Sequence, residues 1–159
     1  MYNNNNYDNN NYQRGPYGDP YTEIMEAIAA GERAHQSLCN AEQALKSAGN
    51  WGLVDMFGGG FFTNMFKHNK MGDASYYMDQ ARFDLQNFQR ELRDVNTFEN
   101  LYIDVGDFLT FADFFFDGFA ADFMVQSKIN DAKRNVAEAI ERVEPILDQL
   151  SRERGYYHG

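Results

Sequence analysis

The chain has 159 residues, 43% of them apolar, which is enough for one domain with a hydrophobic core. Its net charge of −10 excludes the basic footprint of a nucleic-acid-binding protein and disfavours electrostatic binding to an anionic membrane. Only 3 prolines stand among many good helix formers, which favours a helical fold over a turn-rich β fold.

Residues 1–19 predict a disordered N-terminal tail. The segment is rich in Asn and Tyr and lacks the aliphatic side chains whose burial offsets the entropy lost on ordering. It also lacks the basic and apolar regions of a secretion signal. Tyr and Asn at this density can associate weakly with one another.

The rest of the composition indicates a cytoplasmic protein without a transmembrane helix. The single cysteine, Cys39, permits no intrachain disulfide, as is usual in a reducing compartment. The most apolar run, residues 108–125, contains three carboxylates that are costly to place in a bilayer without partners. These are Asp113, Asp117 and Asp122.

The first helix is predicted to begin where Asp19, a favoured N-cap, precedes Pro20, which is favoured at the first helical position. Small or apolar residues then recur at alternating steps of three and four, which is the heptad seam of packed helices. The seam comprises Ile24, Ala27, Gly31, Ala34, Leu38, Ala41, Leu45 and Ala48. Because most of these side chains are small, a neighbouring helix can approach closely. Gly49-Asn50 predicts the end of this helix.

Three more seams follow along the chain. The second comprises Met71, Ala74, Met78, Ala81, Leu85, Phe88, Leu92 and Val95. The third comprises Ile129, Ala132, Val136, Ala139, Val143, Ile146 and Leu150, and Pro145 is predicted to kink that helix. A more aromatic stripe between them comprises Leu101, Val105, Phe108, Ala112, Phe115 and Phe119.

A constant shift of 58 residues relates the second seam to the third. Residues 55–74 also align without gaps on residues 113–132 at this shift, with Gly60 matching Gly118. Phe-rich composition inflates such a match, but composition does not explain why the heptad phase agrees in the helices that follow. We therefore infer a duplicated unit of helix, aromatic Gly turn and long heptad helix.

Two units that each expose an apolar seam can bury it against one another. This predicts an all-α fold, an antiparallel four-helix bundle with pseudo-two-fold symmetry over residues 20–152, followed by a short C-terminal tail at 153–159. Residues 49–69 are too long for a tight loop. Three alternatives stay open for them: a short helix, a packed cap over one bundle end, or a continuous helix from Gly60 to Val95.

A Gly-rich turn before the second long helix is a candidate anion or ligand site, because the backbone at a helix N-terminus can hold an anion. The spacing is not that of a P-loop. The internal repeat keeps only one of the glycines, so a purely structural role in the turn is the competing interpretation. The candidate residues are Gly58, Gly59, Gly60, Lys67, His68 and Lys70.

Aromatic residues near the two turns outnumber what two helix ends usually need. We expect them to form one buried layer, and the alternative is an exposed contact patch. They are Trp51, Phe57, Phe61 and Phe66 in the first unit and Phe115, Phe116, Phe119 and Phe123 in the second.

Metal and catalytic motifs are weak. Glu32 and His35 form one Glu-x-x-His pair, whereas di-iron bundles need two such pairs and two further glutamates. The aspartates between 104 and 122 lack the spacing of a calcium loop. Cys39 has no basic partner in the local pattern and is interpreted as an inert small hydrophobe. We expect no catalytic residue, metal or cofactor.

Two motifs resemble a group of uncharacterised helical proteins, mainly of Gram-positive gut bacteria. One is the WGxxDxxGGG pattern from Trp51, continued by Lys67-His68 and by Lys70-Met71 with Asp73-Ala74. The other runs from Phe116 to Asp131. The group has no assigned activity, so the resemblance implies a bacterial cytosolic origin and no site residue.

The leading hypothesis is a non-enzymatic interaction or assembly module that binds a protein partner or itself. An acidic surface, coiled-coil-like seams and a self-associating tail favour it. The alternative is a helical protein that binds a small ligand or anion at residues 58–70, and a metal-dependent enzyme is the weaker alternative.

Overall fold

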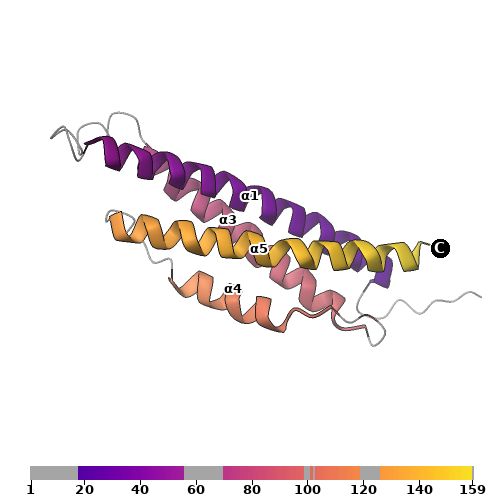
Figure 1. Cartoon of the computed structure of the whole chain (residues 1–159). Helices are drawn as coiled ribbons and strands as arrows, with labels where there is room; N and C mark the ends of the chain where they lie inside the picture. Colours follow the sequence, from indigo (N-terminus) through magenta and orange to yellow (C-terminus); the bar gives the residue numbers. More distant parts are fainter. Residues whose placement is uncertain (1–17, 56–69, 99–100, 102, 119–125, 159) are drawn as a thin grey trace, which may run out of the picture.

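The computed structural model describes residues 18–55, 70–98, 101, 103–118 and 126–158 (Figure 1). These contain four helices and no strand: α1 (Pro20–Asp55), α3 (Lys70–Val95), α4 (Gly106–Gly118) and α5 (Gln126–Tyr157). The predicted all-α class is confirmed for this part of the chain. None of the described helices is long and apolar enough to cross a bilayer.

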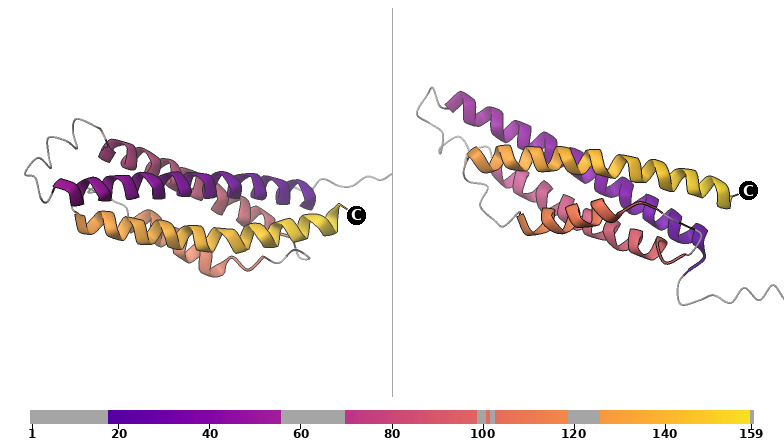
Figure 2. Two further views of the ribbon diagram at one scale, coloured as in Figure 1. Left: turned by 45° about the horizontal axis from the view of Figure 1, so that its top comes forward. Right: turned by 60° about the horizontal axis from the view of Figure 1, so that its bottom comes forward.

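The helices lie side by side and alternate in direction along the chain (Figures 1 and 2). Helix α1 packs along both α3 and α5, whereas the shorter α4 contacts α3 and α5 over a smaller length. In the described helices, the backbone of α3 does not approach that of α5, and α1 does not approach α4. Each helix therefore has two neighbours, and α1 makes the most extensive contacts.

Helix α1 begins at the predicted N-cap. The Thr22 backbone N–H donates to Asp19 Oδ1 at 3.2 Å, and the Thr22 hydroxyl donates to the same carboxylate. These hydrogen bonds from Thr22 lower the pKa of Asp19. Glu23 reaches back to accept a hydrogen bond from the Gly18 N–H at 2.9 Å. The backbone N–H groups of Gly18 and Thr22 are thus both satisfied by side chains at the helix start.

The predicted end of α1 at Gly49-Asn50 is wrong, because the helix continues to Asp55. A glycine inside a helix costs about 1 kcal/mol relative to alanine, and this does not force the helix to stop. Residues 49–55 of the segment with three alternatives therefore belong to α1. Residues 56–69 lie outside the described part of the chain, as does nearly all of the predicted tail at 1–19.

Helix α5 runs through Pro145 and continues to Tyr157, into the segment predicted as a C-terminal tail from residue 153. The side chains there are mostly exposed, and Tyr156 is 82% exposed. The His158 ring nevertheless stacks on Tyr21, with 5.7 Å between the ring centroids. The end of α5 therefore lies beside the start of α1.

Every residue of the four predicted seams whose side chain is described is buried. The core also includes Ile28, Ala30, Ile103 and Phe111, which were not assigned to a seam. Asp113 is exposed and lies off the apolar stripe of α4. The side chains of Ala48, Met71 and Phe119 lie outside the described set. The predicted burial pattern is confirmed wherever it can be compared.

Gly31 marks a close approach of three helices. A Cβ atom placed on Gly31 would lie 2.6 Å from Leu147 Cδ2 of α5 and 2.7 Å from a ring carbon of Phe88 of α3. Carbon atoms in ordinary contact are about 3.5–4.0 Å apart. A side chain at this position would therefore push α1 away from both neighbours.

Two polar contacts join helices at the edge of the core. The Ser37 hydroxyl of α1 donates to the Asp84 carboxylate of α3, and both residues are buried. The Gln89 side-chain amide of α3 donates to Asp113 Oδ1 of α4 at 2.9 Å. Buried polar groups are costly when they lack a partner, so these pairs favour one alignment of α3 against its neighbours.

Truncation of the core should test the equivalence of the second and third seams. Leu85 and Val143 are both 0% exposed and are related by the 58-residue shift. We expect Leu85→Ala to lower the free energy of unfolding by about 2–5 kcal/mol and Val143→Ala by somewhat less. Urea denaturation measures both, with the exposed Gln43→Ala as control. An unchanged midpoint for Leu85→Ala would contradict the seam assignment.

Substitution at Gly31 should test the close approach. We expect Gly31→Val to lower the free energy of unfolding by roughly 1–3 kcal/mol, because the added side chain overpacks the contact with Phe88 and Leu147. Gly155 of α5 has open space around its Cα, so Gly155→Ala should not destabilise the fold. Thermal unfolding followed by circular dichroism compares the two variants. Equal stability of both variants would mean that α1 has room at this position.

Candidate functional site

The predicted anion-binding turn falls largely outside the described residues. This holds for Gly58, Gly59, Gly60, Lys67 and His68. Lys70 is the first residue of α3, and its side chain is not described. The described part of the chain therefore does not test the predicted anion-binding site.

The predicted aromatic set is described at few positions. Phe57, Phe61, Phe66, Phe119 and Phe123 lie outside the described residues, and Trp51 and Phe116 are described only as parts of α1 and α4.

Phe115 of α4 is the member of the aromatic set with a described side chain, and it is 1% exposed. Its ring lies 5.9 Å from that of Phe111, centroid to centroid, and the Arg142 guanidinium lies 4.8 Å over the Phe111 ring. Phe115 is therefore a core residue of α4, and the predicted aromatic layer stays a prediction.

The Cys39 thiol lies in a three-residue array that sequence reasoning missed. The Cys39 Sγ is 3.9 Å from His35 Nδ1, and His35 Nε2 is 3.0 Å from Glu144 Oε1 of α5. The interpretation that Cys39 has no local basic partner is therefore wrong. Residues four apart share a helix face, so the spacing of His35 and Cys39 could have revealed the pair. Glu144 could not be found this way, because it is 109 residues from His35.

The array has limited scope for chemistry. Burial raises the pKa of the Cys39 thiol, and the nearby Glu42 and Glu144 carboxylates raise it further. A raised pKa lowers the fraction of reactive thiolate at neutral pH. Both Cys39 and His35 lie in the interior of α1, where the backbone N–H groups are engaged in the helix and do not form an oxyanion hole. The geometry therefore does not support acyl transfer.

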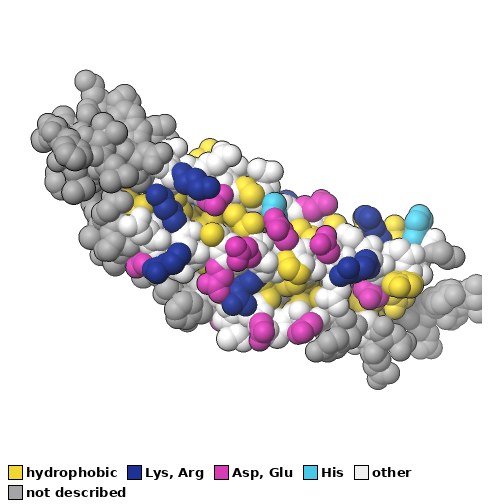
Figure 3. Space-filling model, in the orientation of Figure 1, with side chains coloured by type: hydrophobic (Ala, Val, Ile, Leu, Met, Phe, Trp, Pro, Cys, Tyr) yellow, Lys and Arg dark blue, Asp and Glu magenta, His cyan; other side chains and the backbone are white. Residues whose placement is uncertain are grey.

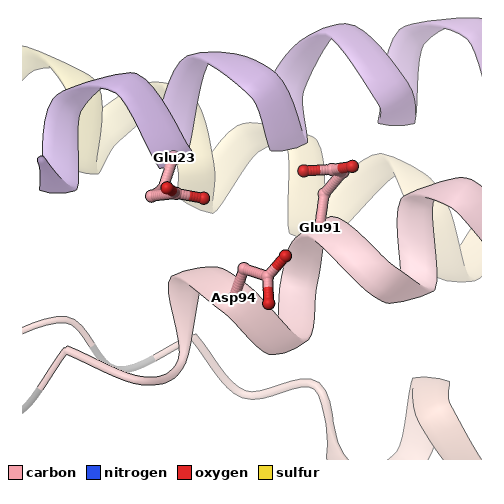
Figure 4. A group of neighbouring side chains, drawn as sticks. All are labelled: Glu23, Glu91 and Asp94. Atoms are coloured by element: carbon pink, nitrogen blue, oxygen red, sulfur yellow. The ribbon is translucent and has the colours of Figure 1, made fainter. Parts of the chain in front are cut away.

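A second group brings three carboxylates together between α1 and α3 (Figure 4). An oxygen atom of Glu23, one of Glu91 and one of Asp94 all lie within 4.8 Å of one another. Burial raises the pKa of Glu91, and repulsion from Glu26, Asp94 and Glu23 raises it further, while Arg90 opposes the shift. The three acids repel one another across the edge of the helix contact.

This carboxylate group offers oxygen ligands that suit a hard cation, but it lacks the other features of a built site. Calcium takes six to eight oxygen ligands, and these three partly exposed side chains would leave most positions to water. Glu23 also accepts a hydrogen bond from the Gly18 backbone. The group is best described as a destabilising concentration of like charge.

The outer face of α3 carries a row of exposed side chains at alternating steps of three and four. We call it the outer row, and it comprises Tyr76, Asp79, Phe83, Gln86, Arg90 and Arg93. Two large aromatic side chains, Tyr76 at 63% and Phe83 at 59%, are exposed one heptad apart. The signal was present in the sequence, because both aromatics lie off the apolar seam of a helix whose seam was already complete.

Other parts of the surface differ from the outer row. On the face seen in Figure 3, acidic and basic side chains are interspersed, and the described atoms form no large area of one sign. Shallow open depressions beside α5 are lined mainly by charged residues, among them Arg134, Glu138 and Arg142. These depressions lack the enclosed apolar walls of a typical small-molecule site.

Comparison of the chain with protein-family models, curated proteins and solved structures finds no match in any of the three.

The carboxylate group predicts a pH dependence of stability. A raised pKa in the folded state means that folding favours protonated Glu91. The stability gained from this protonation is present at low pH and is lost as the pH rises through the folded pKa of Glu91. We therefore expect Glu91→Gln to raise the melting temperature at pH 7 and to have a smaller effect near pH 4. Thermal unfolding across this range measures the difference, with the exposed Glu141→Gln as control. Identical curves for the two variants would show that the three carboxylates do not repel appreciably.

Proposed function

We propose that this protein is a non-enzymatic helical interaction module that binds a protein helix through the outer row of α3. The observation that carries the proposal is the pair Tyr76 and Phe83, 63% and 59% exposed and one heptad apart on one helix face. Single exposed apolar side chains are common on protein surfaces. Two aromatic rings in register on a well-packed helix favour a contact surface instead.

The composition of the outer row supports a protein partner. Tyr and Arg are enriched among residues that dominate binding energy, and the row contains Tyr76, Arg90 and Arg93. The opposite face of α3 is buried against α1 and α4, so the row is presented by a helix whose position is already determined. A rigid surface loses less conformational entropy on binding than a flexible one.

The architecture that presents this row is, in our proposal, an antiparallel four-helix bundle of two related units. The 58-residue shift places buried Leu85 on buried Val143 and relates α3 to α5. Helices α3 and α5 contact shared neighbours and not each other's backbone in the described residues, and the same holds for α1 and α4. This diagonal arrangement is the one that a pseudo-two-fold axis along the bundle requires.

We further propose a bacterial cytoplasmic setting. It rests on the motif resemblance and on the single cysteine, which permits no intrachain disulfide.

Removal of the two aromatic rings should test the proposed function. We expect Tyr76→Ser combined with Phe83→Ser to leave the circular dichroism spectrum unchanged, because both side chains are exposed, and to abolish association. Light scattering measures self-association, and a pull-down with each variant as bait measures binding of other proteins. Tyr156→Ser is the matched control, because Tyr156 is also exposed but lies at the end of α5. A wild-type protein that stays monomeric and retains no partner would contradict the proposal, as would partner binding that is equal in all variants.

A further inference from the structure

The outer row has the spacing of a second coiled-coil seam. Its six residues follow steps of three and four from Tyr76 to Arg93, which cover about five helical turns. In a coiled coil, positions of this kind insert between side chains of a facing helix. The row can therefore accept one helix along its length, and its chemistry indicates which helix.

The six residues are complementary to themselves when read in the opposite direction. An antiparallel pair of α3 helices with a two-fold axis between Phe83 and Gln86 places Asp79 of each chain opposite Arg90 of the other. The same axis places Tyr76 opposite Arg93 and Phe83 opposite Gln86. Two ion pairs, two cation–π contacts and two central Phe83–Gln86 contacts then form from one surface used twice.

A parallel pair would bring like residues together. Asp79 would face its own copy, and so would Arg90 and Arg93. Like charges directly opposite one another are destabilising. The charge order along the row, acidic near its start and basic near its end, therefore selects the antiparallel direction.

Contacts among the described residues leave the side chains of the outer row exposed. Asp79 Oδ1 lies 4.0 Å from the half-buried Arg82 guanidinium, at the distance limit of an ion pair, so this contact contributes little. The side chains of Tyr76 and Phe83 are more than half exposed.

We infer that the partner of the outer row is the same row of a second copy of this chain, packed antiparallel about a two-fold axis. This inference rests on the proposed function and names its partner. The charge complementarity that carries it is internal to α3: Asp79 and Arg90 are spaced symmetrically about the midpoint between Phe83 and Gln86. Because the row is short, we expect a small interface and a correspondingly weak dimer.

The test is a charge exchange in the full-length chain, followed by sedimentation equilibrium. We expect Asp79→Arg to weaken the dimer about tenfold or more, because it places two cations opposite each other at two equivalent positions. Arg90→Asp should have a similar effect. The double variant Asp79→Arg/Arg90→Asp restores both pairs and should bring the dissociation constant back to within about threefold of the wild type. Circular dichroism of each variant checks that the fold is retained.

The outcomes separate this inference from the proposed function. Weakening by each single exchange with recovery in the double variant supports the antiparallel dimer. A dimer that is lost on removing Tyr76 and Phe83 but not recovered by the double exchange keeps the proposed function and overturns the antiparallel pairing. A monomeric wild type that still binds another protein through the outer row also overturns the inference alone. If no substitution in the outer row changes the dissociation constant, the dimer uses another surface of the chain, and this result also overturns the inference.

Discussion

The close approach of α1 to α3 and α5 at Gly31 is the constraint on which the rest of the structure depends. The atoms of Phe88 and Leu147 occupy the volume that a side chain on Gly31 would need. Alanines at 27, 30 and 34 are fully buried on the same helix and extend this narrow contact in both directions. Small side chains let helix backbones come close, and the large side chains of the neighbours then fill the space between them. Helix α1 can therefore contact two helices at once, which makes it the centre of the packing.

This packing decides what α3 presents to solvent. Its core side chains, from Ala74 to Val95, are used against α1 and α4. An α-helix has 3.6 residues per turn, so a seam on one side leaves another row of similar spacing on the other side. Tyr76 and Phe83 fall on that second row. They are exposed because the core is already complete, and the proposed contact surface is a direct consequence of how α3 is held.

The same contacts create both unusual groups of ionisable residues. The His35–Glu144 pair spans the edge between α1 and α5, and Glu23 meets Glu91 and Asp94 at the edge between α1 and α3. Neither group is enclosed. One pairs an imidazole with a carboxylate, and the other concentrates negative charge and raises the pKa of Glu91. Their partial exposure to water moderates both effects.

The sequence by itself determined the helical class, the start of α1 directly after Asp19 and the buried face of every described helix. These follow from local rules: an N-cap acts within one turn, and the spacing of apolar residues shows which side of a helix avoids water. Helix ends were less predictable: α1 continues past Gly49, and α5 continues past residue 152. A single glycine or a polar stretch weakens a helix without ending it. Only the tertiary structure placed Glu144 beside His35 and assembled the three carboxylates from α1 and α3. Such pairs depend on the distance between residues far apart in the chain, and this distance is set by how closely the helices pack, which no local pattern specifies.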